Sequence, residues 1–321
     1  METMTKTDVI IIGGGPAGSS CARRLKQGGA GVILLDRVKF PRFKPCAGWI
    51  TPQVLKLVGM DAASYPFGLT EFTSFDVSIS GLKFKLPTHQ YSIRRFEFDA
   101  WLLELAQPEF YSHEVHEIRL EDGEYIVDEQ YSAPYLVGAG GTHCPVYRTF
   151  FSQVSPKKPA ALIVAQEQEF QYPITDARCK LWFFDGKLPG YAWYVPKKDG
   201  YVNVGVGGFA GQLQRNNDTL KRHWNALVTK LEDTDLIHGH AYKPAGHSYY
   251  LRQAPPEIRI GNAFLAGDSL GLATLDMGEG IGPAIQSGQL AAEAILAGGA
   301  YSVASIPRYS FPSLLGLRKN D

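Results

Sequence analysis

One stretch near the start of this 321-residue chain decides its fold: Asp8-Val9-Ile10-Ile11-Ile12-Gly13-Gly14-Gly15-Pro16-Ala17-Gly18. The β-branched run at its beginning predicts a strand that is buried on both faces in a parallel sheet. The glycine cluster satisfies the pattern G-x-G-x-x-G, and the next residues predict a helix from Ala17 to Gln27. A second apolar strand, Val32–Leu35, then ends at Asp36. This order of elements predicts a βαβ unit.

Each part of this unit suits a dinucleotide. Gly13 permits a tight turn, Gly15 lets the main chain approach a pyrophosphate, and Gly18 allows close packing of helix and strand. The free N–H groups at the helix N-terminus attract the pyrophosphate. Asp36 can bond the ribose hydroxyls, and its charge disfavours the extra phosphate of NADP. We predict that the dinucleotide is bound by Gly13, Gly15, Pro16, Ala17, Gly18, Asp36 and Arg37.

The composition is that of a globular protein and disfavours several functional classes. The chain is 45% hydrophobic and 20% charged, as in soluble globular proteins, and its 32 lysines and arginines equal its 32 aspartates and glutamates. Because the charges balance, the chain has no net positive charge that would attract nucleic acid or an acidic membrane. The four cysteines do not have the spacing of a zinc site, so we predict no metal. The chain has no signal-peptide pattern and no run of about 18 apolar residues, which favours a cytoplasmic protein without a transmembrane segment.

The far end of the chain separates FAD from NAD. A predicted strand, Ile260–Ala266, leads into a glycine-rich loop and a helix from about Pro283 to Ala297. This region resembles the second FAD-binding motif of glutathione-reductase-type flavoproteins, in the branch that holds aromatic hydroxylases, flavin halogenases and geranylgeranyl reductases. The resemblance implies that the aspartate after the strand bonds the ribityl chain and that the loop lies along the isoalloxazine. A helix N-terminus there stabilises the negative charge of a reduced flavin. The residues expected to bind FAD here are Gly267, Asp268, Gly278, Gly280 and Ile281.

A third element of that branch, R-x-x-F-D, resembles the segment Arg95–Asp99. Its arginine usually contacts the flavin nucleotide, which implies this role for Arg95, with Arg94 as the alternative.

Two further segments resemble the geranylgeranyl reductase family. Lys44–Trp49 resembles its K-x-C-G-G loop, with Ala47 in place of the first glycine. Pro189–Pro196 resembles its Y-x-W-x-F-P motif, which lines the prenyl cavity, with Val195 in place of the phenylalanine. The resemblance implies that the cysteine loop lies near the flavin and contributes Cys46, Ala47 and Gly48 to the cofactor site.

The chemistry of such a reductase requires an apolar site, and the sequence offers aromatic residues for it. An isoprenoid needs a long apolar cavity beside the flavin, and Tyr191 and Trp193 share one face of a strand because they are two residues apart. We expect reduced FAD to transfer hydride to a C=C bond. The candidate catalytic residues are Cys46, Tyr191, Trp193 and Glu279. The expected partner is an apolar small molecule such as an isoprenoid lipid, while peripheral membrane contact and an electron-donor protein stay open.

Three alternatives to this reductase are a flavin halogenase, a flavin monooxygenase and a non-catalytic flavoprotein. Halogenases carry tryptophan where Tyr191 stands, which disfavours halogenation. The segment Gly138–Arg148 resembles the G-A-D-G-x-x-S element of hydroxylases, but Gly140 replaces the aspartate and Cys144 the serine. This change leaves the electron donor open among NADPH, ferredoxin and others. A flavin monooxygenase and a non-catalytic FAD-binding electron-transfer protein remain the alternatives.

The expected fold is α/β, with a Rossmann-like FAD domain and an antiparallel-sheet substrate domain. The FAD domain is expected over 1–68, 93–155 and 256–300, and the substrate domain over 69–92 and 156–255. The latter includes a helical stretch whose core stripe is Leu220, Trp224, Leu227 and Leu231. A tail over 301–321 is expected to pack on the core through Tyr309, Phe311, Leu314, Leu315 and Leu317.

Overall fold

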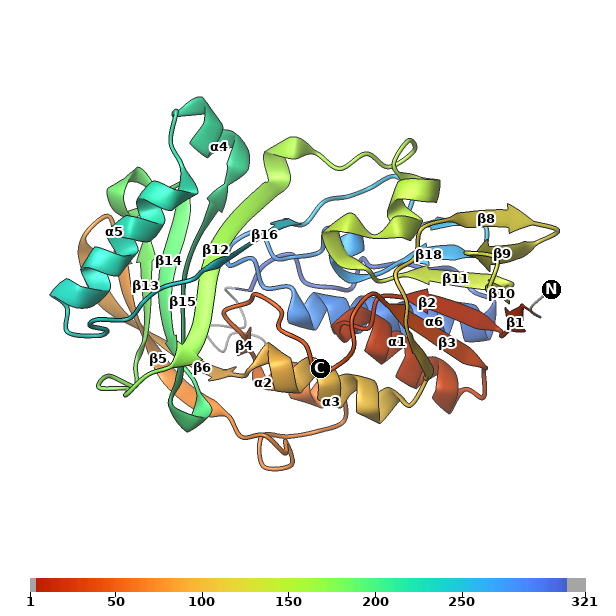
Figure 1. Cartoon of the computed structure of the whole chain (residues 1–321), viewed down its shortest axis with the longest axis horizontal. Helices are drawn as coiled ribbons and strands as arrows, with labels where there is room; N and C mark the ends of the chain where they lie inside the picture. The colour runs from red at the N-terminus through yellow and green to blue at the C-terminus, as the bar shows by residue number, and fades with distance from the viewer. Residues whose placement is uncertain (1–3, 311–321) are drawn as a thin grey trace. The chain divides into compact units, whose positions relative to one another are not determined.

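The computed structural model describes residues 4–310, which form two compact units. The first unit contains the chain up to Arg42, Phe96–Lys158 and Tyr250–Tyr309. The second unit contains Phe43–Arg95, Pro159–Tyr249 and Ser310. Figure 1 colours the elements of both units by their position in the chain.

A six-stranded sheet forms the centre of the first unit, in the order β17-β18-β11-β2-β3-β7. Its strands, in that order, are Arg259–Ile260, Ala263–Leu265, Tyr135–Gly138, Val9–Ile12, Val32–Asp36 and Glu109–Ser112. All neighbours pair in parallel except β17 and β18. The parallel sheet predicted from the glycine-rich segment is therefore present, and its carboxyl edge carries the loops after β2, β3, β11 and β18.

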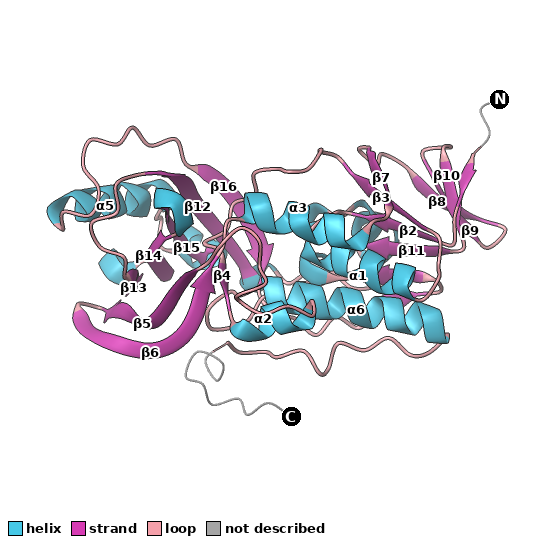
Figure 2. Ribbon diagram, turned by 90° about the horizontal axis from the view of Figure 1, so that it is seen from below, coloured by secondary structure: helices cyan, strands magenta, loops and turns pink. Residues whose placement is uncertain are grey.

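Both faces of this sheet are covered, as the β-branched composition of β2 predicts. Val9 and Ile11 pack with α1 (Pro16–Gln27) and α6 (Ile281–Ala297) on one face. Ile10 and Ile12 belong to a separate core on the other face. That core is shared with a four-stranded sheet of β1 (Thr5–Lys6), β10 (Tyr131–Ala133), β9 (Glu124–Val127) and β8 (Ile118–Glu121). Figure 2 shows α1 and α6 side by side, with α3 (Arg95–Ala106) next to α1.

An eight-stranded sheet forms the second unit, in the order β16-β12-β15-β14-β13-β5-β6-β4. Its strands, in that order, are Ala245–Tyr250, Leu162–Gln171, Tyr201–Phe209, Gly190–Pro196, Cys179–Phe183, Thr70–Ile79, Leu82–Ser92 and Trp49–Ile50. The predicted antiparallel pairing holds for β12–β15–β14–β13 and for β5–β6–β4. It is wrong for β13 and β5, which pair in parallel because β13 follows β5 by a long connection and enters beside it in the same direction.

One face of the eight-stranded sheet is covered by helix α5 (Leu220–Asp233), which Figure 1 shows lying across the strands. Trp224, Leu227 and Leu231 of α5 are buried against the sheet, which confirms the predicted core stripe. Ala192 and Tyr194 of β14 face α5. Because side chains alternate along a strand, the residues between them face the opposite side.

The remaining elements are short. They are the helices α2 (Pro52–Leu57) and α4 (Ala210–Arg215), five 3-10 turns (Gly141–His143, Pro159–Ala161, Asp185–Lys187, Lys198–Gly200 and Gly267–Ser269) and one π turn (Tyr147–Phe151). The predicted helical stretch with Leu220 and Leu231 is the single helix α5, and the turn at Asn216–Asn217 separates it from the short helix α4.

The boundaries of the units differ from the predicted domains at one large segment. Residues 43–68 were expected in the FAD domain, but they cluster with the second unit. The physical reason is main-chain pairing, since Trp49 and Ile50 pair with Ser92 and Tyr91 of β6. The other boundaries move by a few residues, and the functional roles of the two units stay predictions.

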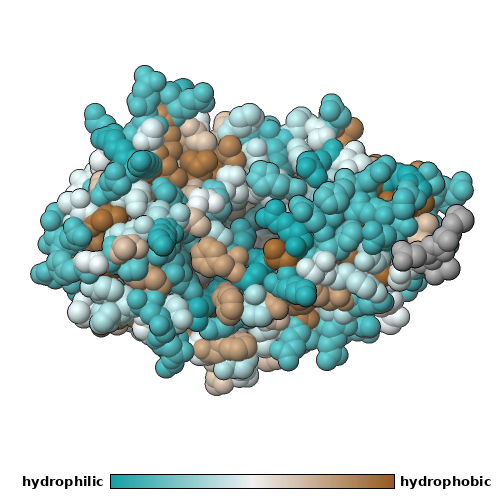
Figure 3. Space-filling model, viewed as in Figure 1, coloured by the Kyte–Doolittle hydropathy of each residue, from teal (hydrophilic) through white to brown (hydrophobic). Residues whose placement is uncertain are grey.

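No helix among residues 4–310 is long and apolar enough to cross a membrane. The face drawn in Figure 3 is mainly hydrophilic, with hydrophobic residues in several separate groups. Of the apolar tail residues named above, Tyr309 is exposed, whereas Phe311, Leu314, Leu315 and Leu317 lie outside the described part of the chain.

Candidate cofactor and substrate sites

The glycine-rich loop after β2 has no room for side chains at two of its glycines. Gly13 has φ +108°, and a Cβ there would lie 2.4 Å from the carbonyl oxygen of Ala139. A Cβ on Gly18 would lie 1.8 Å from the carbonyl oxygen of Gly13. Both approaches are far below contact distance, so only glycine lets α1 begin this close to the strand.

The N-terminus of α1 is open to an anion. Its N-cap is Gly15, no side chain caps it, and its first turn has no acidic residue. A Cβ on Gly15 would meet only Arg42 Nη2, at 3.6 Å. The first N–H groups of a helix have no partner within the helix and carry partial positive charge. This uncapped N-terminus therefore fits the pyrophosphate of a dinucleotide.

Asp36, at the end of β3, holds the glycine-rich loop in place. Its Oδ2 accepts a hydrogen bond of 2.8 Å from the N–H of Gly14, and its Oδ1 accepts one of 3.1 Å from the N–H of Val38. A carboxylate has about four acceptor positions, so further ones stay available for ribose hydroxyls. Arg37, beside it, is exposed.

The structure brings the second predicted cofactor motif against the first. Gly267 follows β18 with φ +63°, and its N–H donates to Ser287 Oγ of α6 at 2.9 Å. A Cβ on Gly267 would lie 3.0 Å from the Cβ of Ala17, and one on Gly288 would lie 2.1 Å from the carbonyl oxygen of Ala17. Helices α1 and α6 are thus in close contact, although the two motifs lie at opposite ends of the chain.

Asp268 lies at the N-terminus of α6. A Cβ on Gly280, the N-cap residue of α6, would be 3.4 Å from Asp268 Oδ1. The loop before α6 is held by Thr274, whose N–H donates to the carbonyl oxygen of Glu279 and whose Oγ1 accepts from the N–H of Glu279. Gly278, with φ +66°, makes the turn. An uncapped helix end beside this glycine-rich turn fits the pyrimidine edge of a flavin.

Arg42 is a residue of this region that sequence reasoning missed. Its guanidinium lies near Gly15, contacts Asp99 Oδ2 at 3.4 Å and stacks 4.8 Å above the ring of Phe40. Asp99 is fully buried and belongs to the R-x-x-F-D element. The signal available in the sequence was this aspartate of the R-x-x-F-D element, whose charge requires a cationic partner once it is buried.

In the second unit the structure connects Cys46 to Trp193, two predicted catalytic residues. Asn203 of β15 makes the connection: its Oδ1 accepts from Trp193 Nε1 at 2.7 Å, and its Nδ2 donates to the carbonyl oxygen of Cys46 at 3.4 Å. The N–H of Cys46 donates to Glu167 Oε1. We call Glu167, Asn203 and Trp193 the Cys46 clamp.

The sulfur of Cys46 has a main-chain donor of its own. Gly48 adopts φ +77° and directs its N–H to Cys46 Sγ at 3.4 Å. A Cβ on Gly48 would lie 2.3 Å from the carbonyl oxygen of Ile93, so glycine is required here, whereas the alanine at position 47 is tolerated.

A buried group of charges lies beside the clamp. Lys197 Nζ binds Glu169 Oε2 at 2.7 Å, and Arg94 Nε binds Glu169 Oε1 at 2.8 Å. The Arg94 guanidinium also stacks 3.4 Å from the ring centre of Tyr201. Burial alone would raise the pKa of Glu169, but Lys197 and Arg94 outweigh it and lower that pKa. Arg94 is therefore committed to this ion pair, while Arg95 is a buried residue that begins α3.

Aromatic rings gather on the sheet face opposite α5. Tyr191 and Trp193 lie with ring centres 5.7 Å apart, which confirms that they share one face. Tyr191 also contacts Phe183, at 5.0 Å, and Trp49, at 6.3 Å. Trp49 in turn contacts Phe75. This aromatic face (Trp49, Phe75, Phe183, Tyr191 and Trp193) has the composition of a wall for an apolar chain.

The predicted site residues thus fall into two groups. The glycine-rich loops, Asp36, Asp268, Glu279 and Ile281 belong to the first unit, while Cys46–Gly48, Arg95, Tyr191 and Trp193 belong to the second. Glu167 and Asn203 were missed. Glu167 continues the alternating burial of Ile163 and Ala165 along β12, but the apolar run Leu162–Ala165 and the polar run Gln166–Glu169 show no alternation in the sequence that could have marked it.

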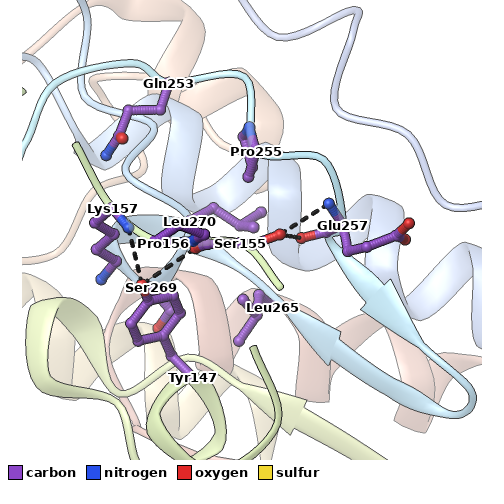
Figure 4. A pocket seen from close by; sticks show the side chains of 10 residues that line it. All are labelled: Tyr147, Ser155, Pro156, Lys157, Gln253, Pro255, Glu257, Leu265, Ser269 and Leu270. Carbon is purple, nitrogen blue, oxygen red and sulfur yellow. Dashed lines mark hydrogen bonds between the residues drawn. The ribbon is translucent and has the colours of Figure 1, made fainter. Parts of the chain in front are cut away.

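One cavity in the first unit lies beside the second motif (Figure 4). Its volume is about 10 Å³, enough for about one water molecule. Its lining consists of Tyr147, Ser155, Pro156, Lys157, Gln253, Pro255, Glu257, Leu265, Ser269 and Leu270. Several of these residues are already hydrogen-bonded to one another, as the Lys157 N–H is to the Tyr147 hydroxyl at 3.0 Å. A space of this size does not hold a substrate.

Comparison with known proteins gives sequence relatives over most of the chain. Residues 6–65 match the model of a family described as an FAD binding domain. An uncharacterized protein of Methanosarcina barkeri is 30% identical, over 92% of this chain and 76% of the relative. A menaquinone reductase of Mycobacterium tuberculosis is 25% identical, over 91% and 77%. A digeranylgeranylglycerophospholipid reductase of Methanopyrus kandleri is 27% identical, over 72% and 60%.

Solved structures share the fold. A geranylgeranyl bacteriochlorophyll reductase-like protein of Thermoplasma acidophilum has a TM-score of 0.78 at 18% identity, over 92% of this chain and 79% of that one. The flavin-dependent halogenase CmlS has a TM-score of 0.71 at 19% identity, over 92% and 59%. These likenesses confirm the predicted α/β fold with a Rossmann-like domain and a second sheet domain.

Proposed function

This chain belongs to the geranylgeranyl reductase family of FAD-dependent oxidoreductases, and we propose that it reduces C=C bonds of an isoprenoid or similar apolar substrate. The observation that carries the proposal is the hydrogen-bonded connection from Cys46 through Asn203 to Trp193 on the aromatic face. It joins the two segments whose sequences resemble this family. Relatives named for reducing a geranylgeranyl lipid and menaquinone support an apolar substrate.

The cofactor is FAD, and the residues of the first unit fit it. The uncapped N-terminus of α1 and the open space at Gly15 would hold the pyrophosphate, with Arg42 beside it. Asp36 would hold the ribose, and Asp268 with Gly278 and Gly280 would hold the flavin end. When bound and reduced, FAD supplies a hydride for one carbon of the double bond.

The aromatic face would orient the substrate and exclude water from it. An unactivated alkene has no carbonyl group that a side chain could polarise, so alignment and a dry site must provide most of the catalysis. Tyr191 and Trp193 offer broad apolar surfaces for this purpose, and Trp193 keeps its only polar atom bonded to Asn203.

Cys46 is the proposed source of the proton for the second carbon. Its thiol lies in a half-buried loop and receives the N–H of Gly48, which stabilises the sulfur after it gives up the proton. A water molecule held by Glu279 is the alternative source, from the start of α6 in the first unit.

The reaction can be tested directly by mass spectrometry. Chemically reduced FAD-loaded protein is mixed with a geranylgeranyl lipid without oxygen, and we expect a gain of two hydrogen atoms per reduced double bond. No change in mass, followed by oxygen insertion into another substrate in air, would indicate a flavin monooxygenase. No product in either experiment would indicate a non-catalytic FAD-binding electron-transfer protein.

The role of Cys46 has a separate test. Cys46→Ala should slow reoxidation of the reduced protein by the lipid by about tenfold or more, within the usual contribution of a positioned acid, and leave FAD content unchanged. The matched control is Cys179→Ala, a buried cysteine on β13 of the same unit. Unchanged reoxidation in Cys46→Ala removes the thiol from the mechanism.

The loop Gly138–Cys144 bears on which molecule reduces the flavin. The loop Gly138–Cys144, which resembles the hydroxylase element, lies against the glycine-rich loop through Ala139. Its missing aspartate favours a donor other than NADPH, such as a ferredoxin. Reduction of the flavin by each donor, followed by stopped-flow absorbance, distinguishes them.

A further inference from the structure

Glu167 is a buried carboxyl group in contact with the Cys46 loop. It lies on β12 with 1% of its surface exposed, on the face that also carries Trp193. Its register places it opposite Gly205 of β15, which in turn pairs with Trp193 of β14. Three adjacent strands therefore bring Glu167 and Trp193 to either side of one glycine.

The two oxygens of Glu167 have different surroundings. Oε1 accepts hydrogen bonds from the N–H of Cys46 and from Asn203 Nδ2, the latter at 3.2 Å. Oε2 is buried and has no hydrogen-bond partner among residues 4–310. An ionised carboxylate with one unpartnered buried oxygen is strongly disfavoured, whereas a proton on that oxygen removes the charge.

The nearby charges do not neutralise Glu167 directly. Lys197, which is fully buried, binds Glu169 rather than Glu167, and Arg94 binds Glu169 as well. Lys44, from the Cys46 loop, acts on Glu167 only as a weaker, more distant charge. Burial raises the pKa of Glu167 to about 7, because it outweighs the opposing effects of Lys197, Asn203, the Cys46 N–H and Lys44.

We propose that Glu167 is a positioning residue for Cys46: with Asn203 it holds the main chain of the cysteine loop, and the proton on its Oε2 controls the charge beside that loop. Neutral Glu167 holds the loop without adding a negative charge to it. Ionised Glu167 places a negative charge beside the loop, which repels the negative charge that a reacting sulfur carries. The effect of Glu167 on catalysis rests on the proposed reductase function. Its role in holding the cysteine loop does not depend on that function.

The test measures how fast Cys46 reacts with a maleimide in FAD-loaded, oxidised protein, with no lipid present. Cys46 is the half-buried cysteine of the chain, and Cys21, Cys144 and Cys179 are buried, so labelling at Cys46 is resolved by peptide mass spectrometry. Glu167→Ala removes the acceptor of the Cys46 N–H and should raise the labelling rate by about tenfold, as expected for loss of such hydrogen bonds. Glu167→Gln keeps an oxygen in place of Oε1 and should stay close to the wild-type rate.

The pH profile separates positioning from a general structural effect. The wild-type labelling rate should flatten as pH rises through about 7, where Glu167 ionises. The profile of Glu167→Gln should show no such flattening, because glutamine does not titrate. The control is Asp76→Asn, which removes a carboxylate of the same sheet that binds Lys180 and does not contact the cysteine loop. Its rate and profile should match those of the wild type.

The proposal can fail in two ways. An unchanged labelling rate in Glu167→Ala overturns the clamp. A flattening that persists in Glu167→Gln shows that the proton on Glu167 does not cause the pH dependence. Should Glu167→Ala not fold, Trp193→Phe removes the donor to Asn203 together with part of the ring that packs beside Gly205. It should raise the labelling rate about threefold, because this hydrogen bond holds Cys46 only through Asn203. An unchanged rate in Trp193→Phe also overturns the clamp. Because lipid is absent, either failure leaves the proposed reductase function untouched, and failure of lipid reduction leaves the clamp untouched.

Discussion

The glycine-rich loop of the first unit and the Cys46 clamp of the second are built in opposite ways. The loop uses main-chain N–H groups and glycines within one βαβ segment, from Gly13 to Asp36. The clamp uses side chains of Glu167, Trp193 and Asn203 to hold Cys46, which lies 121 positions from Glu167 and 157 from Asn203 in the sequence. Main-chain sites can be recognised from local spacing, since glycine is required at fixed positions. Side-chain sites of this kind depend on strand register.

Glycines take part in both regions, for different reasons. In the loop, Gly18 makes room for the main chain of Gly13. In the sheet, Gly205 makes room for the indole of Trp193, since a Cβ there would lie 2.2 Å from Trp193 Cζ2. The same residue type thus positions a cofactor loop in one unit and an aromatic side chain in the other.

The largest effect is expected for Gly18→Ala. The added Cβ overlaps the carbonyl oxygen of Gly13, which must move and distort the loop. FAD affinity should fall by about a thousandfold or more, or about 4 kcal/mol. Flavin absorbance per protein and fluorescence titration measure it. Gly299→Ala, whose Cβ meets nothing within 4 Å, is the control and should bind FAD normally. Normal FAD content in Gly18→Ala would mean that the loop is not the cofactor site.

The second prediction concerns the stability of the clamp region as pH changes. Glu167 has its usual pKa of 4.5 when unfolded and about 7 when folded, so between these values the folded chain holds a proton that the unfolded chain has lost. Stability from this group is therefore complete below about pH 4.5 and falls as pH rises to about 7. Glutamine does not titrate. The free energy of unfolding of Glu167→Gln minus that of wild type should rise across this window by on the order of 2–3 kcal/mol.

Urea unfolding at a series of pH values measures this difference. His247, whose pKa burial lowers to about 4 with help from Lys44 and Arg95, contributes the opposite slope but is present in both proteins and cancels. A difference that stays constant with pH would show that Glu167 is ionised throughout.

The third prediction separates the two regions by function. Gly205→Ala forces the Trp193 ring and the Glu167 side chain apart, and overpacking of this kind costs about 1–3 kcal/mol. Lipid turnover should fall by about tenfold while FAD affinity stays unchanged, since the first unit is unaffected. Gly211→Ala, with only a distant contact to Arg215, is the control in the same unit. Loss of FAD in Gly205→Ala would contradict the division of roles.

The smallest effect is expected for Arg42→Lys in the glycine-rich loop region. Lysine keeps the charge near Gly15 and Asp99 but loses the planar, two-pronged donor of arginine. FAD affinity should fall by about 1 kcal/mol or less, about fivefold at most. Titration at low and high salt measures it. An effect as large as that of Gly18→Ala would make Arg42 a principal FAD ligand rather than an accessory one.

Much of the first unit could be predicted from sequence because its signals are local. The strand at Val9–Ile12, the helix α1 and the strand β3 all appear within a residue or two of their predicted ends. Ala22 and Leu25, on the predicted helix, are both fully buried. The segment 43–68 was misplaced because its two-residue strand, Trp49–Ile50, carries no periodic pattern.

The second unit was predictable in its motifs but not in its connections. Tyr191 and Trp193 share a face because β-strand geometry requires it. Glu167 and Glu169, in contrast, occur in the polar run Gln166–Glu169, which by itself predicts a solvated strand. Their burial depends on the strands that lie beside them.

The amino-acid sequence by itself determined the cofactor turn and the alternation of the strands, because glycine spacing and side-chain period follow from covalent geometry alone. Only the tertiary structure decided that Ala17 meets Gly288, that Arg42 pairs with buried Asp99, and that Glu167 and Asn203 hold Cys46. These contacts join distant parts of the chain through sheet order and register. A side chain's charge and hydrogen bonds then depend on neighbours that no local pattern specifies.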